Sequence, residues 1–319
     1  MQIGYHASHE QFPPSRLLAT AARAEQAGFE AVLSSDHLAP WSESQGESGF
    51  AWSWLGAVLA TTSLPAAVVT APGDRYHPAI TAQAIGTLTE MFPERLVPAL
   101  GSGQALNEHV TGRPWPPKPV RNRRLAECAD VIRRLLAGEE VTHEGLVTVH
   151  AATVWSRPAV PPPLFAAALS PATAREVAAW ADGLITVNAP LPDLTAVIEA
   201  FREAGGEGRP VHVQAHLSWA PDAGEAEAQA LAHWRANALP PILNEELALP
   251  AQVDAASVHV PLDRLRSSVW IHTDPRWYVD ALAAYADLGV DRVYLHQVGP
   301  DQERFVDVFG ERVLPAVRP

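Results

Sequence analysis

An acidic residue and an imidazole stand side by side early in the chain, in the segment Ser35-Asp36-His37. An imidazole titrates near neutral pH, so His37 could move a proton or stabilise a charge that develops on a substrate. Trp41 follows four residues later and would add an aromatic wall suited to a flat ring ligand. A histidine that only caps a loop would fit the same pattern, and the sequence leaves both interpretations open.

Two further segments combine small residues with a turn. Gly101 and Gly103 bracket a turn where the backbone could approach a ligand closely, although ordinary turn glycines would look the same. Ser170 and Pro171 have the residue types of a helix N-cap and of the first helical position. Free amide groups at a helix start can bind phosphate, but an ordinary cap is the simpler explanation of these two residues.

Metal ligands are sparse. His6 and His9 are three residues apart, but they follow a predicted strand and do not lie on a helix. Asp36 is the main carboxylate at a strand end. Because a divalent ion needs several converging ligands, the sequence predicts no metal site.

Short β-like runs alternate with helix-like segments along the chain, which is the pattern of βαβ units around a parallel sheet. We expect eight strands, at residues 3–6, 31–34, 66–70, 96–100, 164–167, 183–187, 211–218 and 293–296. A doubly wound open sheet would want a glycine-rich turn after the first strand, and that turn is missing. The predicted fold class is therefore α/β, a (β/α)8 TIM barrel, in which function lies at the C-terminal strand ends.

The chain is expected to form one domain over residues 1–319. Residues 140–149 alternate like a β-hairpin at the barrel surface. Residues 239–268 lack clear periodicity and are too long for a plain connection, so we expect an insertion that partly covers the mouth of the barrel.

Composition excludes several classes of protein. The formal charge of −13, with no basic cluster beyond residues 121–124, argues against nucleic acids and anionic membranes as partners. No apolar run approaches the roughly 20 residues of a membrane helix. Cys128 is the single cysteine, which favours a reducing compartment, the cytoplasm. Lys118, the single lysine, stands among prolines, so a Walker phosphate loop and a Schiff-base lysine are not expected.

Several separated motifs resemble one family. Residues 35–41 resemble the signature after the second strand of luciferase-like flavin and deazaflavin oxidoreductases. Residues 101–108 are similar to the glycine-rich turn of their deazaflavin-dependent glucose-6-phosphate dehydrogenase branch, and residues 75–79 and 301–305 fit that branch too. The similarity runs along nearly the whole chain.

This resemblance implies a flavin-type ring at the barrel mouth. Asp36 and Asn107 would contact the cofactor. Val68 and Val69 fall where the family has a bulge, often with a non-proline cis peptide bond, that supports the ring. Such a bond is costly and would mark the site.

The resemblance also assigns the remaining site residues. The loop of Ala168, Leu169 and Ser170 would meet the cofactor phosphate. His37 would be the active-site imidazole, and Trp41 would shape the substrate side. The family further implies a homodimer acting on a small molecule.

Three departures from the branch matter. Gln104 takes the catalytic position of a proton-donating glutamate, and a neutral amide cannot exchange a proton. Leu169 and Ser170 replace paired glycines, and a leucine side chain would crowd a polyanionic cofactor tail. Lysines that grip a sugar phosphate have no counterpart, so glucose 6-phosphate is not the expected substrate.

These departures favour FMN as the cofactor, and a flavin-dependent oxidoreductase or monooxygenase as the function. The first alternative is a dehydrogenase or reductase of a small alcohol or carbonyl that uses the deazaflavin coenzyme F420. The second is a flavin-binding protein without catalytic activity. In all three interpretations the ring chemistry belongs to the cofactor, which the protein positions.

Overall fold

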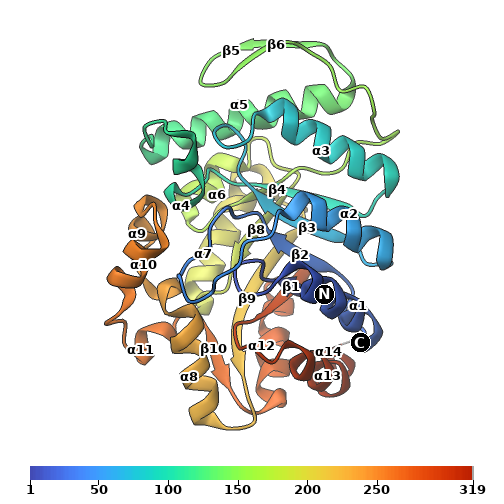
Figure 1. Ribbon diagram of the computed structural model, residues 1–319. Helices are drawn as coiled ribbons and strands as arrows, with labels where there is room; N and C mark the ends of the chain where they lie inside the picture. Colours follow the sequence, from blue (N-terminus) through green and yellow to red (C-terminus); the bar gives the residue numbers. More distant parts are fainter. Residues whose placement is uncertain (318–319) are drawn as a thin grey trace.

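A closed barrel of parallel strands forms the centre of the molecule, in a computed structural model that describes residues 1–317 (Figure 1). β11 pairs with β1, and β8 pairs with β9, which closes the sheet. The predicted (β/α)8 fold is confirmed, and each predicted strand lies within a few residues of an observed one. In order around the barrel the strands are β1 (Gln2–Ala7), β2 (Val32–Ser35), β3 (Ala66–Thr70), β4 (Leu96–Leu100), β7 (Phe165–Ala167), β8 (Gly183–Val187), β9 (Val211–Trp219) and β11 (Arg292–Gln297).

Helices surround the barrel because each strand buries both of its faces, one against the barrel interior and one against the helical layer. Several helices begin with a proline, whose fixed φ and missing N–H suit the first helical turn. The covering helices are α1 (Pro14–Ala27), α2 (Ala51–Thr61), α3 (Pro78–Met91), α5 (Lys118–Ala137), α6 (Pro171–Val177), α7 (Leu191–Phe201), α8 (Ala223–Trp234), α12 (Pro275–Asp287) and α13 (Gln302–Arg312). Shorter helical segments are α4 (Ala105–Glu108), η1 (His109–Thr111), η2 (Arg202–Gly206), η3 (Arg235–Ala238) and α14 (Leu314–Val317).

The lower barrel interior is filled by a few large rings and many small residues. Phe165 and Tyr294 are buried there. A Cβ atom at Gly183 would lie 2.4 Å from the Phe165 ring, and one at Gly4 would lie 2.5 Å from the Tyr294 ring. These two glycines therefore make room for the rings that close the bottom of the barrel.

Two excursions leave the barrel. Strands β5 (Val141–Glu144) and β6 (Thr148–Ala152) form an antiparallel hairpin beyond α5, which confirms the hairpin predicted there (Figure 1). Residues 239–268 form three short helices, α9 (Pro241–Glu246), α10 (Pro250–Ser257) and α11 (Leu262–Leu265). A short strand that the sequence did not indicate, β10 (Trp270–His272), then pairs with the end of β9.

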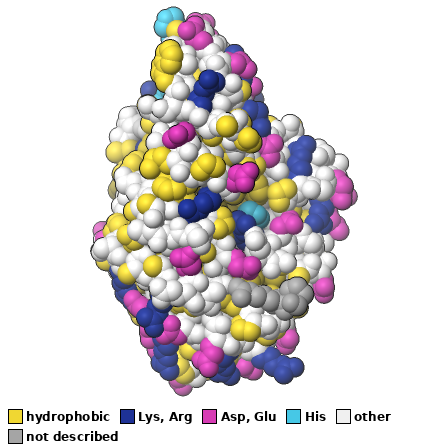
Figure 2. Space-filling view, turned by 90° about the vertical axis from the view of Figure 1, so that its right-hand side faces the viewer, with side chains coloured by type: hydrophobic (Ala, Val, Ile, Leu, Met, Phe, Trp, Pro, Cys, Tyr) yellow, Lys and Arg dark blue, Asp and Glu magenta, His cyan; other side chains and the backbone are white. Residues whose placement is uncertain are grey.

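The surface seen in Figure 2 carries acidic and basic side chains interspersed among apolar groups, with no block of one sign. Within residues 1–317, no helix is both long and apolar enough to cross a membrane. Residues 1–317 also contain no group of three or more histidine, cysteine, aspartate or glutamate side chains that could hold a metal ion.

Candidate active site

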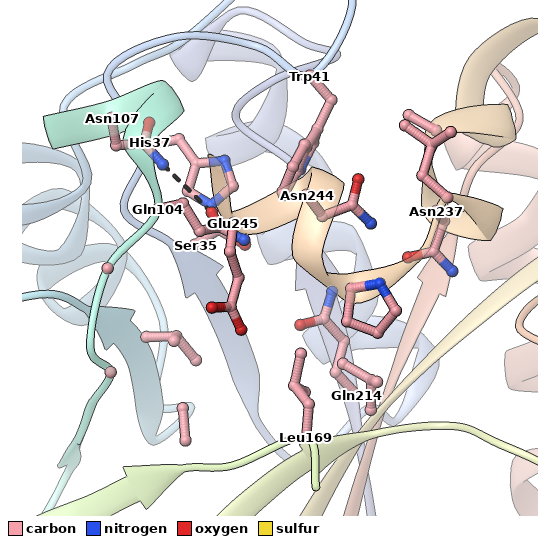
Figure 3. Close-up of a pocket in the computed structure, with 18 of the residues that line it drawn as sticks. Ser35, His37, Trp41, Gln104, Asn107, Leu169, Gln214, Asn237, Asn244 and Glu245 are labelled. Carbon is pink, nitrogen blue, oxygen red and sulfur yellow. Dashed lines mark hydrogen bonds between the residues drawn. The ribbon is translucent and has the colours of Figure 1, made fainter. Parts of the chain in front are cut away.

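A cavity of about 740 Å³ opens at the C-terminal ends of the barrel strands (Figure 3). Its floor is apolar and comes from β3, β7 and β8, through Val69, Ala167, Ile185 and Val187. Its rim is polar and comes from the loops after the strands. The insertion closes one side, where Asn244 and Glu245 of α9 point toward the cavity (Figure 3).

His37 lines this cavity and contacts a buried carboxylate. The Nδ1 atom of His37 is 2.9 Å from Oε1 of Glu10, whose side chain is only 1% exposed. The Trp41 ring packs edge-on against the imidazole, with the ring centroids 5.4 Å apart. This arrangement fixes the orientation of the imidazole and leaves Nε2 as the ring nitrogen that a ligand can reach.

The charge of Glu10 depends on its neighbour. Burial alone would raise the pKa of this carboxyl group, but the nearby His37 outweighs burial and holds the pKa below its usual value. Ser8 Oγ donates a hydrogen bond of 2.9 Å to the other carboxylate oxygen. Glu10 therefore remains an anion that can stabilise positive charge on His37.

Asp36 lines the cavity wall, but its carboxylate already has protein partners. Thr70 Oγ1 donates to one oxygen at 2.7 Å, and Tyr76 Oη donates to the other at 3.0 Å. Arg75 lies 3.4 Å from the carboxylate and also donates to the Asp36 carbonyl at 2.8 Å. These contacts tie the end of β2 to the end of β3, which keeps the following His37 in place.

Asn107 holds the loop after His37 from the other side. Its Oδ1 accepts hydrogen bonds from the backbone N–H groups of Leu38 at 2.8 Å and Ala39 at 3.4 Å. Its Nδ2 donates to Oε1 of Gln104 at 3.4 Å, so both side chains face the cavity together (Figure 3). Gln104 precedes α4 and brings a neutral amide into the wall.

The expectation for Val68 is wrong, whereas Val69 does line the cavity. Successive side chains of a strand point to opposite faces, so the two valines cannot both face the ring. Val68 is fully buried in the core between the strands and the helical layer. β3 keeps continuous register with β2 and β4, so the predicted bulge is absent there. Residues 1–317 contain no cis peptide bond.

The loop after β7 borders the cavity through Ala168, Leu169 and Ser170. Ser170 is the N-cap of α6, and its hydroxyl accepts a hydrogen bond from the Thr173 N–H at 3.3 Å. The Leu169 side chain is 60% exposed and stands on the rim. This loop therefore offers one hydroxyl group, that of Ser170, and one apolar side chain to a ligand.

A second group of histidines adjoins the cavity through His216. Gln214 Nε2 lies 3.2 Å from His216 Nε2 and 3.3 Å from His296 Nδ1, so it can donate to both rings. Burial lowers the pKa of His216 to about 4, and it lowers the pKa of His296 as well. Both rings therefore stay neutral near neutral pH, and each has a ring nitrogen within hydrogen-bond distance of Gln214.

The family model described as luciferase-like monooxygenase matches residues 1–292. The chain belongs to this family. The resemblance predicted from the motifs is thereby confirmed, and the protein is an oxidoreductase.

Relatives within the luciferase-like family are similar over their full length. An F420-dependent glucose-6-phosphate dehydrogenase of Microbacterium testaceum is 36% identical over 329 residues, with 100% of this chain and 98% of the relative covered. A second protein of that name from Nakamurella multipartita is also 36% identical, with 100% and 97% covered. The solved structure of an F420-dependent secondary alcohol dehydrogenase in complex with an F420-acetone adduct has 32% identity and a TM-score of 0.92, covering 100% and 99% of the chains. These relatives support the F420 alternative and give no support to FMN.

Sequence reasoning missed several cavity residues that this luciferase-like barrel brings together. Among the missed residues, Glu10 was the easiest to predict, because it closely follows β1 and strand ends carry the function in such barrels. Gln214 lies within β9, and Trp234 ends α8, so neither had a local signal. Of the tryptophans, Trp41 and Trp234 line the cavity, whereas Trp52 is buried in the core.

Proposed function

We propose that the protein is an F420-dependent dehydrogenase that interconverts small, uncharged secondary alcohols and their ketones. The observation that carries this proposal is the buried Glu10 carboxylate 2.9 Å from His37, both of which line a largely apolar cavity. Such a pair can take a proton from an alcohol and return it to a ketone. The named activities of the most similar relatives support the same chemistry.

The cavity suits a deazaflavin. Its volume of about 740 Å³ lies within the range of cofactor sites. Small side chains on the floor, such as Ala167 and Val69, leave a flat apolar surface for a ring, while Gln104 and Ser170 offer polar groups at the edges. When bound, this cofactor accepts or returns the hydride. We assign FMN no role, because the comparisons do not favour it.

His37 supplies the acid–base step. Oxidation of a secondary alcohol releases one hydride from carbon and one proton from oxygen, and forms a C=O bond. Nε2 of His37 accepts the proton while Glu10, held by Ser8, stabilises the charge that forms on the ring. In the reverse direction His37 returns the proton to the ketone oxygen. Gln104 only donates or accepts hydrogen bonds.

Charge around the cavity favours an uncharged substrate. Six carboxylate residues line it against two cationic ones, Lys118 and Arg235. Lys118 pairs with Glu245, and both cations come from elements next to the insertion. Since Lys118 is already paired with a carboxylate, few free positive charges are left to bind the phosphate of a phosphorylated sugar.

Cofactor titration and turnover together test the proposal. The purified protein is titrated with F420 and with FMN while fluorescence is followed, and is then assayed with 2-propanol and with glucose 6-phosphate. We expect F420 to bind more tightly and 2-propanol to reduce it. His37→Asn should bind F420 like the native protein but lose turnover. Tighter binding of FMN, or faster turnover of glucose 6-phosphate, would overturn the proposal.

We also propose that the enzyme is a cytoplasmic homodimer, on the basis of the family resemblance and of its cysteine usage. Sedimentation analysis of the purified protein measures the oligomeric state directly. A monomer at working concentration would contradict the dimer.

A further inference from the structure

Four neutral polar side chains line one side of the cavity, and we call them the polar wall. They come from β9, α8, η3 and α9, and they are Gln214, Trp234, Asn237 and Asn244. Figure 3 shows the three amide groups on the same side of the cavity, which Trp41 also borders. None of the four side chains carries a charge, so their only polar interaction with a ligand is hydrogen bonding.

The indole of Trp234 provides a donor that the protein does not use. The residue is only 6% exposed, and its ring packs against those of His216 and His296, with centroids 5.4 and 4.4 Å apart. Within the described residues, the buried Nε1 atom has no hydrogen-bond partner. Because an unpaired buried N–H group costs free energy, this donor indicates a place where a ligand supplies the acceptor.

The amide groups add an unused acceptor. Oδ1 of Asn244 is buried and, like the indole, has no hydrogen-bond partner in residues 1–317. Asn237 Nδ2 lies 3.5 Å from the Ser268 carbonyl, which is the limit of a hydrogen bond. Gln214 directs its Nε2 atom to two imidazole rings. The polar wall therefore contains an unpaired donor and an unpaired acceptor.

A hydroxyl group suits both kinds of unpaired atom, because it donates one hydrogen bond and accepts others. A carboxylate or a phosphate only accepts, and it would also meet the six carboxylates that line the cavity. An ammonium group only donates, so it would leave the Trp234 N–H unpaired. Since His37 accepts the proton of the hydroxyl that reacts, the polar wall is left for a second one.

We propose that the preferred substrate is an uncharged secondary alcohol that carries a second hydroxyl group, and that the polar wall binds this second hydroxyl. The reaction itself rests on the proposed function, and the second hydroxyl is unchanged by it. A simple alkanol leaves the buried groups of the wall unpaired, and a site of that kind discriminates against the analogue that lacks the hydroxyl. Alcohols such as 2-propanol remain substrates, with a lower kcat/KM.

Matched pairs of alcohols test the polar wall, because each pair differs only by a hydroxyl in place of a methyl group. The pairs are 1,2-propanediol with 2-butanol, 1,3-butanediol with 2-pentanol, and 1,4-pentanediol with 2-hexanol. Reduction of F420 is followed for each alcohol. In the pair whose length fits the cavity, we expect kcat/KM to be at least about tenfold higher for the diol. Equal or lower values for the diol in all three pairs would overturn the proposal.

Variants of the wall show which groups cause the preference. Asn244→Leu keeps the approximate volume and removes the hydrogen-bonding groups, so the ratio of kcat/KM for diol and alkanol should fall about five- to tenfold. Trp234→Phe keeps an aromatic ring and removes only the N–H group, and it should lower the same ratio. If Asn244→Leu fails to fold in a thermal melt, Trp234→Phe alone decides. A ratio that neither variant changes would overturn the proposal.

Ser257→Ala is the matched control. Ser257 lines the same cavity, but its hydroxyl already donates to the Asp254 carbonyl at 3.3 Å. This variant should leave the ratio unchanged. A fall as large as that in Asn244→Leu would show that any loss of polarity in the cavity has the same effect, and would contradict a specific wall.

Two further measurements separate this inference from the proposed function. F420 binding is titrated in Asn244→Leu; weaker binding together with equal slowing of diol and alkanol would assign the wall to the cofactor and overturn the inference. If diols and alkanols are oxidised equally well, the inference fails while the proposed function stands. If no alcohol reduces F420, the proposed function fails, and saturation-transfer NMR with the same pairs decides the wall. Diol binding that Asn244→Leu weakens would support it, and no preference for the diol would overturn it.

Discussion

Replacement of Glu10 by glutamine removes one charge from the catalytic pair and changes almost nothing else in shape. Glu10 Oε1 lies 2.9 Å from His37 Nδ1, and the side chain is 1% exposed. An amide oxygen can still accept from the imidazole, so the ring should keep its orientation. The variant lacks the anion that stabilises positive charge on His37 during proton transfer.

The magnitude follows from the strength of such contacts. A hydrogen bond to a charged group contributes about 1.5–3 kcal/mol, and about 1.4 kcal/mol corresponds to a factor of ten in rate. We therefore expect kcat for 2-propanol oxidation to fall about 10- to 150-fold in Glu10→Gln. The KM for the alcohol should change little, because the charge forms only as the proton moves.

The assay follows the loss of oxidised F420 absorbance under steady-state conditions. Ser8→Ala is the control, since it removes the hydrogen bond to the other oxygen of Glu10 and leaves the His37 contact intact. Glu10→Gln should cause little further loss in a His37→Asn background, because the two residues act as one unit. A kcat within about twofold of the native value, or an effect confined to KM, would refute this reasoning.

Three other predictions concern stability and positioning. Burial lowers the pKa of His216 from 6.5 to about 4, so the unfolded chain binds a proton at this residue at a higher pH than the folded protein does. The contribution of this group to the free energy of unfolding should be complete above pH 6.5. Between pH 6.5 and pH 4 it should fall by about 1.4 kcal/mol per pH unit. Chemical denaturation at several pH values measures this slope, and His216→Gln should reduce it by the contribution of this one group, because the pKa values of His6, His212 and His296 are lowered by burial as well. Asp36→Ala removes the buried carboxylate that pairs with Arg75, so the free energy of unfolding, measured by urea denaturation, should fall by about 3–5 kcal/mol. A residue that only contacts the cofactor would not cause such a loss. Asn107→Ala removes the acceptor of the Leu38 and Ala39 N–H groups, which hold the loop after His37. It should lower kcat and lower the free energy of unfolding by only about 1–2 kcal/mol. An unchanged kcat would show that the loop does not need this support.

Strand positions followed from local pattern, because parallel barrel strands are short apolar runs between helices with clear periodicity. The predicted strands at residues 66–70, 96–100 and 183–187 agree with β3, β4 and β8. The rule that barrels act at their strand ends then placed His37 and Gln104 on one cavity. The error at Val68 was avoidable, since period-two alternation on β3 already assigns the two valines to opposite faces.

The other misses have non-local causes. β10 exists because three residues after the insertion reach the end of β9, and nothing in their own composition requires that pairing. The contact between Glu10 and His37 joins the ends of two different strands. The pairing of Glu245 with Lys118 joins residues 127 positions apart. Such contacts depend on how the barrel closes, which a local pattern does not encode.

Transfer of deuterium tests the central claim most directly. The native enzyme is mixed with oxidised F420 and with 2-propanol labelled with deuterium at C2, and the reduced cofactor is analysed by mass spectrometry. We predict one deuterium in the cofactor per acetone formed, a reduction slowed by a primary isotope effect, and loss of both products in His37→Asn. Acetone formed without deuterium in the cofactor, or no reduction of F420 by this alcohol, would contradict the account.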